Sequence, residues 1–228
     1  MPSGDSTEDP GSLRPSVDLD PVLRLTEKTL REHGVNAAGA GWASAETQAL
    51  RFEMLAQAVG LDRETPVTVN DLGCGYGALH EYLADHGFDV TEYHGYDISA
   101  DMLAAARTHV SCASPHFVRS PYVTKTADVS LLSGPLNYKS CDDAAWKLYA
   151  RSVIVNLAAH SRHGFAFNMM TTRVTYRVAH LYYADPDEWL DWCRREIDAD
   201  FTLLHDYPLY EWTIGGRFSR GEAAASHR

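Results

Sequence analysis

The stretch VTVNDLGCGYGALHEYL, residues 67–83, decides the fold that we expect. It opens with a β-branched run, reaches an acid at Asp71, and then places Gly73, Gly75 and Gly77 before a helical pattern. A strand that passes through glycine turns into a helix brings backbone N–H groups and a helix N-terminus to one edge of a sheet. Ligands of open α/β sheets bind at that edge. The stretch therefore predicts an α/β fold with a ligand site at its glycine loop.

Helical and extended patterns alternate along the rest of the chain. The expected helices are 20–33, 44–60, 78–86, 99–109, 142–160 and 186–197, and the expected strands are 66–71, 90–96, 116–118, 128–132, 165–170, 201–205 and 210–214. Such alternation predicts a mostly parallel sheet with helices on both faces. The link between the last two strands is too short for a parallel crossover, so the last strand should run antiparallel. We expect a Rossmann-like seven-stranded sheet.

The length of 228 residues is that of one domain, which we place at 19–218 between disordered tails at 1–18 and 219–228. The chain has no apolar run long enough to span a membrane, and its N-terminus has no apolar signal-peptide core. We therefore expect a cytoplasmic protein without a membrane partner. The net charge of -11 argues against nucleic-acid binding, which requires a basic surface.

The four cysteines are scattered and form no Cys-x-x-Cys pair. This spacing predicts reduced thiols and neither a zinc site nor a disulfide framework, so we expect no metal. The sequence leaves the oligomeric state open, including a homodimer.

A second acid, Asp97, ends the expected strand that follows the glycine loop. A carboxylate at this position can accept hydrogen bonds from ribose hydroxyls, and Ser99 is available to cap the next helix. The glycines also satisfy a dinucleotide fingerprint that ends at Ala78. Two features favour S-adenosylmethionine instead: glycine recurs at every second position, and Asp71 can attract the cationic methionine end of that molecule. The Tyr-x-x-x-Lys pair of short-chain reductases does not occur.

On these motifs, the sequence resembles the class I S-adenosylmethionine-dependent methyltransferases over about residues 42–218. The motifs that carry the resemblance are DLGCGYG at 71–77, YHGYDIS at 93–99, ADVSLLSGPLN at 127–137 and LLHDYPLYEWTI at 203–214. The stretch GWASAETQALRF at 41–52 is further similar to a small-molecule subgroup found in bacterial biosynthetic clusters. The resemblance implies S-adenosyl-L-methionine as cofactor and a small molecule as partner.

The resemblance also implies which residues contact the cofactor. They are Asp71, Gly73, Gly75 and Gly77 at the methionine end, Arg51 at the methionine carboxylate, Asp97 at the ribose, Ile98 and Met102 over the adenine, and Ser133 and Gly134 beneath the sulfonium. The third-strand region departs from the family pattern, so the contact to the adenine amine stays unassigned, with Tyr122 as a candidate.

Methyl transfer to an acceptor of high pKa needs a base, and histidine is the natural candidate. We favour His205, which an adjacent Asp206 could orient, although neighbouring residues on a strand point to opposite faces. Asn137, Tyr138 and Asn168 follow or end strands and could hold a substrate amine or hydroxyl. An aromatic-rich stretch at 176–192, together with Trp42 and an N-terminal helical lid, could exclude water from the site.

The function that we expect is methyl transfer from S-adenosylmethionine to an oxygen or nitrogen of a small molecule. Two alternatives stay open. In the first, the amine of S-adenosylmethionine attacks its own side chain and releases methylthioadenosine, as in azetidine-2-carboxylate synthases. In the second, the chain is a nicotinamide-dependent reductase. A methyltransferase-like module without activity is disfavoured, because a site without function has no need of the intact glycines and Asp97.

Overall fold

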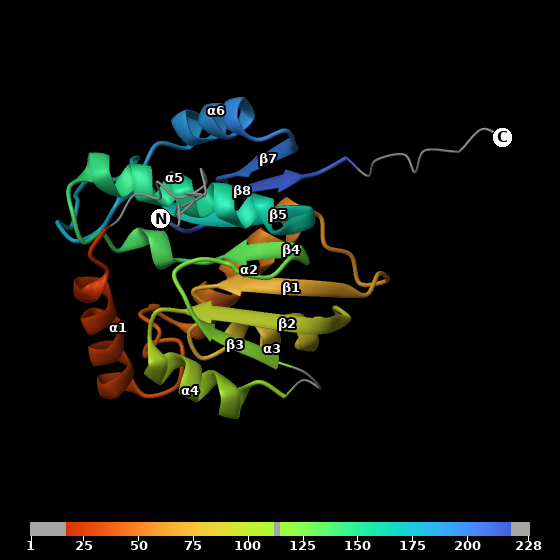
Figure 1. The fold of residues 1–228 in the computed structure, drawn as a ribbon. Helices are drawn as coiled ribbons and strands as arrows, with labels where there is room; N and C mark the ends of the chain where they lie inside the picture. Colours follow the sequence, from red (N-terminus) through yellow and green to blue (C-terminus); the bar gives the residue numbers. More distant parts are fainter. Residues whose placement is uncertain (1–16, 112–114, 220–228) are drawn as a thin grey trace, which may run out of the picture.

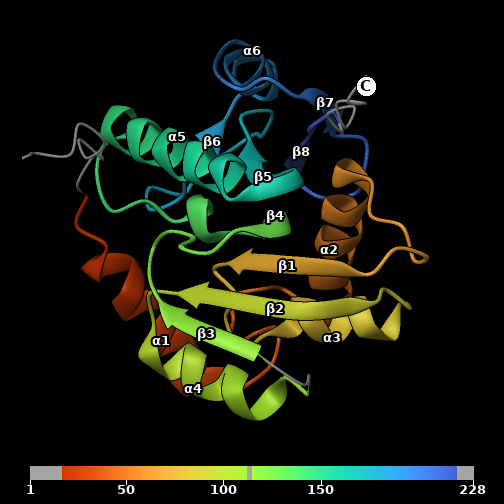
Figure 2. The same cartoon turned by 45° about the vertical axis from the view of Figure 1, so that its right-hand side comes forward.

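A computed structural model describes residues 17–111 and 115–219 of the chain. Within these residues, one sheet carries the strand order β3-β2-β1-β4-β5-β8-β7, and β6 pairs with the end of β5 (Figures 1 and 2). The strands are β1 Val67–Leu72, β2 Val90–Asp97, β3 Pro115–Arg119, β4 Ala127–Leu132, β5 Ser161–Thr171, β6 Tyr183–Ala184, β7 Asp200–Leu204 and β8 Glu211–Arg217. Strand β8 runs antiparallel to β5 and β7, whereas the other pairs are parallel.

The helices cover both faces of this sheet. They are α1 Asp20–His33, α2 Ala45–Val59, α3 Ala78–Asp85, α4 Ala100–His109, α5 Asp143–Ala159 and α6 Pro186–Glu196, with a 3-10 turn η1 at Pro135–Asn137. One buried cluster packs α2 and α3 against the sheet, and the other packs α5 and α6 against the opposite face. Figure 2 shows α5 in front of the strands and α2 and α3 behind them. The two clusters remove apolar surface from water on both sides of the sheet, as the sequence pattern predicts.

Local signals set the helix ends at the ligand-binding edge. Ser99 caps α4 and accepts a hydrogen bond from the Met102 N–H, as expected. Ser44 caps α2, and Thr47 completes the capping box. Gln48 is buried and accepts a hydrogen bond from the Tyr76 hydroxyl at 3.0 Å, which ties α2 to the glycine loop.

The sequence-based fold is confirmed in class and strand direction, but several element boundaries differ, among them the end of β8 at Arg217. Strand β5 begins at Ser161, four residues before the expected start at Phe165, because its first residues pair with Ala127 at the start of β4. The two-residue strand β6 was not expected, since two residues are too few to show an alternating pattern.

The predicted tails lie outside the described residues except for residues 17, 18 and 219, so the proposed limits of the domain stay a prediction. Across 17–111 and 115–219, no helix combines the length and the apolar character needed to cross a membrane.

Candidate functional site

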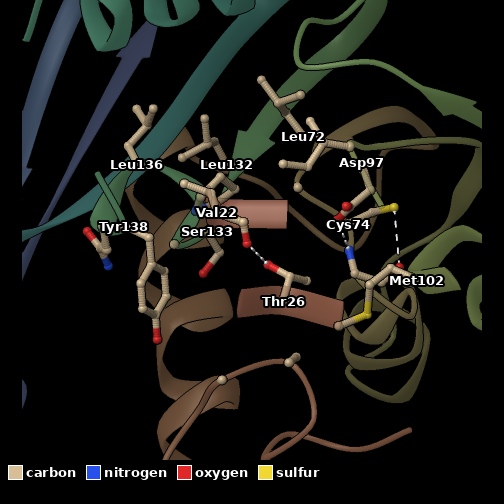
Figure 3. Close-up of a pocket in the computed structure, with 18 of the residues that line it drawn as sticks. Val22, Thr26, Leu72, Cys74, Asp97, Met102, Leu132, Ser133, Leu136 and Tyr138 are labelled. Carbon is tan, nitrogen blue, oxygen red and sulfur yellow. Dashed lines mark hydrogen bonds between the residues drawn. The ribbon is translucent and has the colours of Figure 1, made fainter. Parts of the chain in front are cut away.

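A cavity of about 340 Å³ lies at the carboxyl ends of β1, β2 and β4, where the sheet changes its direction of strand order. Its wall includes the glycine loop, the residues after β4, the start of α2 and residues of α1 and of the 40–43 segment. In Figure 3, Asp97 and Met102 lie at one end, Tyr138 lies at the other, and Ser133 lies between them. We refer to these as the Asp97 end and the Tyr138 end.

The glycine loop forms the floor of the Asp97 end. Gly73 and Gly75 have φ of 77° and 53°, a conformation that side chains disfavour. A side chain on Gly73 would collide with Pro135, whereas one on Gly75 would meet nothing nearer than the Met102 sulfur at 3.9 Å. Gly75 therefore leaves open space above the backbone, which a ligand can approach closely.

Asp97 turns its carboxylate toward the glycine loop. Its Oδ2 accepts the Gly75 N–H at 3.0 Å, and its Oδ1 accepts the Ser99 N–H at 2.8 Å. Burial raises the pKa of Asp97, and these backbone hydrogen bonds oppose the rise. A carboxylate has about four lone-pair sites, more than these backbone hydrogen bonds use, so the group can hold the loop and still accept a hydrogen bond from a ligand hydroxyl.

Asp71 lies deeper in the same wall and is buried beside the Tyr93 hydroxyl, which donates a hydrogen bond to it. Burial raises the pKa of Asp71 to about 7, with a further contribution from the charge of Asp97, while the hydrogen bond from Tyr93 opposes the shift. A buried carboxylate of this kind gains most from a positively charged neighbour.

The segment after β4 separates the two ends of the cavity. The Ser133 hydroxyl is buried, lines the cavity and has no hydrogen-bond partner among the described residues. Gly134 has φ of 89° and donates its N–H to the Asn168 side chain at 2.9 Å, and a side chain there would collide with Trp42. A buried hydroxyl without a partner is costly, which makes Ser133 a ready contact for a bound molecule.

The Tyr138 end combines apolar and polar groups. Tyr138 lines the cavity, and burial raises the pKa of its phenol, so the hydroxyl stays protonated at neutral pH. Asn137 also lines the cavity, where its side-chain oxygen accepts the Met170 N–H at 3.0 Å. Arg51 and Glu211 form an ion pair with an N–O distance of 2.8 Å in the same wall.

The cavity brings together most of the residues predicted from sequence. Those in its wall are Arg51, Asp71, Gly73, Gly75, Asp97, Ile98, Met102, Ser133, Gly134, Asn137 and Tyr138. Their contacts to a cofactor or a substrate stay predictions. For Arg51 the structure adds a partner that the sequence did not suggest, because Glu211 occupies two of the five guanidinium N–H groups and the Thr47 carbonyl a third.

Four predicted residues are not in the wall, and one of them is Tyr122, whose hydroxyl lies 3.2 Å from the Ser152 hydroxyl. His205 is exposed and follows β7, the edge strand, four strands away from β1, which is about 19 Å across the sheet. Asn168 is buried behind the wall and bridges Gly134 and Glu211. Gly77 has φ of 88°, and a side chain there would collide with Val110 at the end of α4, so packing alone explains this glycine.

The aromatic side chains of the 176–192 stretch do not line the cavity, although Leu181 of that stretch does. Tyr182, Trp189 and Trp192 are buried in the core beneath α5 and α6, and Tyr176 is exposed. Other aromatic residues line the cavity, namely Trp42, Phe52, Tyr76, Tyr138, Trp146 and Tyr149. Helix α1 contributes Val22 and Thr26 to the wall, which fits the expected helical lid.

Comparisons with known proteins identify the family of this chain. Residues 69–151 match a family model described as a methyltransferase domain. The chain is 40% identical over 153 residues to the methyltransferase Rv1506c of Mycobacterium tuberculosis (strain ATCC 25618 / H37Rv). The matched region covers 65% of this chain and 92% of that relative. The chain belongs to this methyltransferase family. The match spans the glycine loop, Asp97 and the segment after β4.

Solved methyltransferases share the fold of this family member. Magnesium protoporphyrin IX methyltransferase from Synechocystis PCC 6803, with bound SAH, superposes with a TM-score of 0.64 at 15% identity, covering 89% of this chain and 100% of that one. The 1,6-didemethyltoxoflavin-N1-methyltransferase of Burkholderia thailandensis superposes with a TM-score of 0.58 at 16% identity, covering 89% of this chain and 90% of that one. At these identities the likeness shows a shared fold, and the family of the chain rests on the Mycobacterium tuberculosis relative.

The residues at the Asp97 end fit S-adenosylmethionine, the cofactor that the sequence resemblance implies. Gly75 leaves room for close approach, the Asp97 carboxylate can accept hydrogen bonds, and Asp71 supplies negative charge near the loop. The buried hydroxyl of Ser133 lies on the path toward the Tyr138 end without a partner among the described residues. A cationic, hydroxyl-bearing molecule matches this set of groups.

Proposed function

We propose that this methyltransferase transfers a methyl group to an oxygen or nitrogen atom of a small molecule, which binds at the Tyr138 end of the cavity. The observation that carries the proposal is that a single cavity joins the glycine loop to a second, aromatic end. A ligand in one end lies directly beside a ligand in the other. The related folds include the toxoflavin enzyme, whose structure holds its small-molecule substrate and S-adenosylhomocysteine together.

In this proposal, Gly73, Gly75 and Asp71 receive the methionine portion of the cofactor, and Asp97 accepts hydrogen bonds from its ribose. Ile98 and Met102 cover the adenine. When bound, S-adenosylmethionine supplies an electrophilic methyl group on a positively charged sulfur. The chain contributes chiefly alignment, because the leaving group is a neutral thioether and the main task is to hold the acceptor in line with the methyl carbon.

The acceptor is held by groups that face the Tyr138 end. The Tyr138 hydroxyl stays protonated and can donate a hydrogen bond, and the Ser133 hydroxyl can donate or accept one. Aromatic walls exclude water around the reacting atoms. None of the described residues that line the cavity is a histidine, so His205 is not part of this proposal.

Calorimetry with S-adenosylmethionine and with a nicotinamide dinucleotide tests the cofactor assignment. We expect binding of the first only. Replacing Asp97 with Ala should weaken that binding by about 1–3 kcal/mol, the range for losing hydrogen bonds to a charged group. An unchanged affinity in the Asp97→Ala protein, with its fold intact, would contradict the role of Asp97.

The mass of the nucleoside product separates methyl transfer from cyclisation. Incubation with S-adenosylmethionine and a set of small phenols, alcohols and amines should yield S-adenosylhomocysteine and an acceptor that is one methyl group heavier. Methylthioadenosine that forms without any acceptor would instead identify the cyclase reaction.

A further inference from the structure

The Tyr138 end of the cavity contains an ion pair whose charges cancel. Among the described residues that line the cavity, Arg51 is the single cation, and the acids are Asp71, Asp97 and Glu211. Asp71 and Asp97 lie at the glycine loop, whereas Glu211 opens β8 and pairs with Arg51 of α2. The charge of Glu211 thus falls on the only cationic side chain among the described lining residues.

The geometry of the pair is bidentate. The Arg51 Nε–H donates to Glu211 Oε2 at 2.9 Å, and Nη2–H donates to Oε1 at 2.8 Å. The side chains are only 11% and 5% exposed. A buried, bidentate pair is screened little by water, so each charge effectively neutralises the other.

Surrounding groups hold Glu211 and Arg51 in this arrangement. The Asn168 amide donates to Glu211 Oε2 at 3.0 Å from behind, and the Thr47 carbonyl accepts from Arg51 Nη1 at 2.7 Å. The Trp42 ring covers the guanidinium, with its centroid 4.3 Å from Cζ. The pair therefore cannot easily separate to offer Arg51 to another anion.

We propose that Glu211 is a specificity-determining residue that makes the Tyr138 end accept uncharged acceptors and reject anionic ones. This inference rests on the proposed function. An anionic acceptor would lose its water, meet an arginine that is already paired, and face the Glu211 carboxylate. An uncharged acceptor avoids that cost and can hydrogen-bond to the Ser133 hydroxyl, which has no partner among the described residues.

The test uses probes of one shape and different charge on the protein loaded with S-adenosylhomocysteine. Benzoate is anionic, benzamide is neutral and benzamidinium is cationic. We expect Glu211→Gln to bind benzoate more tightly than the unchanged protein by about tenfold or more, because the substitution leaves a buried arginine without a counter-charge. Benzamide affinity should stay the same. Ligand-detected NMR or calorimetry measures both.

A reciprocal variant keeps the test decisive if Glu211→Gln does not fold. Arg51→Gln leaves the Glu211 carboxylate uncompensated, so benzamidinium should gain affinity by a similar factor of about tenfold, while benzoate should not. The double variant Arg51→Gln/Glu211→Gln removes both charges and is the matched control. Neither benzoate nor benzamidinium should bind it more tightly than the unchanged protein.

Several results would overturn the inference. One is equal benzoate affinity in the unchanged protein and in Glu211→Gln. Another is a Glu211→Gln protein that gains affinity for S-adenosylhomocysteine but not for benzoate, because Arg51 would then bind the carboxylate of the cofactor and not the acceptor. Failure of the unchanged protein to bind S-adenosylhomocysteine would instead contradict the proposed function.

Discussion

We expect Asp71 to couple cofactor binding to pH, because burial in the cavity wall raises its pKa to about 7. A positively charged ligand beside the carboxylate favours its ionised form and lowers that pKa. Binding therefore releases a proton when Asp71 begins protonated. We expect the affinity for S-adenosylmethionine to fall as the pH drops below about 7 and to level off above it.

Titration calorimetry between pH 6 and pH 8 (roughly one unit either side of the Asp71 pKa) checks this expectation. In Asp71→Asn the affinity should be lower and nearly independent of pH, since no proton is left to release. Methylthioadenosine lacks both the amino acid and the charge on sulfur, so its affinity should change little with pH even in the unchanged protein. A pH dependence that survives in Asp71→Asn would assign the proton to another group.

At the scale of single residues, the sequence predicted the Asp97 end of the cavity better than the Tyr138 end. Asp71, Gly73, Gly75 and Asp97 belong to contiguous motifs, so local spacing alone brings them to one edge. Glu211 was missed, because its partner Arg51 lies 160 residues away and the pairing depends on the full sheet order. The one feature of the sequence that could have indicated Glu211 is that a charged residue begins the largely apolar strand β8.

His205 was favoured as a base because Asp206 is adjacent to it in the sequence. In the structure β8 inserts between β5 and β7, so His205 lies at the edge of the sheet and not in the cavity wall. The sequence predicted the antiparallel direction of β8 from its short link. It did not show on which side of β8 the strand β7 would pair.

At the scale of elements, the turn from the glycine loop into α3 depends on Gly77. Gly77→Ala should lower the free energy of unfolding by about 2–4 kcal/mol, the sum of left-handed strain and overpacking against Val110. Gly87 has a similar φ of 76° but only the Arg63 Cδ at 3.8 Å near its missing side chain, so Gly87→Ala should cost about 1 kcal/mol. Urea unfolding of both variants measures the difference, and equal losses would rule out the contact with Val110.

Element boundaries followed the sequence where a cap or a glycine marks them. Ser99 opens α4 and Gly34 ends α1 as expected, because side-chain caps and glycines with positive φ act through adjacent residues. The start of β5 and the whole of β6 depend on pairing with distant strands, so no local pattern could locate them.

At the scale of the whole molecule, the cavity draws its wall from α1, α2, the ends of β1, β2 and β4, and the first residue of β8. A ligand that contacts so many elements should stabilise them together. S-adenosylhomocysteine at about 100 times its Kd should add about 2.7 kcal/mol and raise the unfolding midpoint by roughly 5–10 °C. A thermal scan with and without the ligand measures the shift, and a nicotinamide dinucleotide at the same concentration should give none.

The contact between Gly73 and Pro135 limits how this protein can acquire new acceptors. The ring of Pro135 fills the place where a side chain on Gly73 would lie, so the turn after β4 rests directly on the loop that we propose receives the methyl donor. Rebuilding that turn would disturb the donor as well. Diversification in relatives should therefore concentrate in α1 and the 40–43 segment, which border the same space without carrying that constraint.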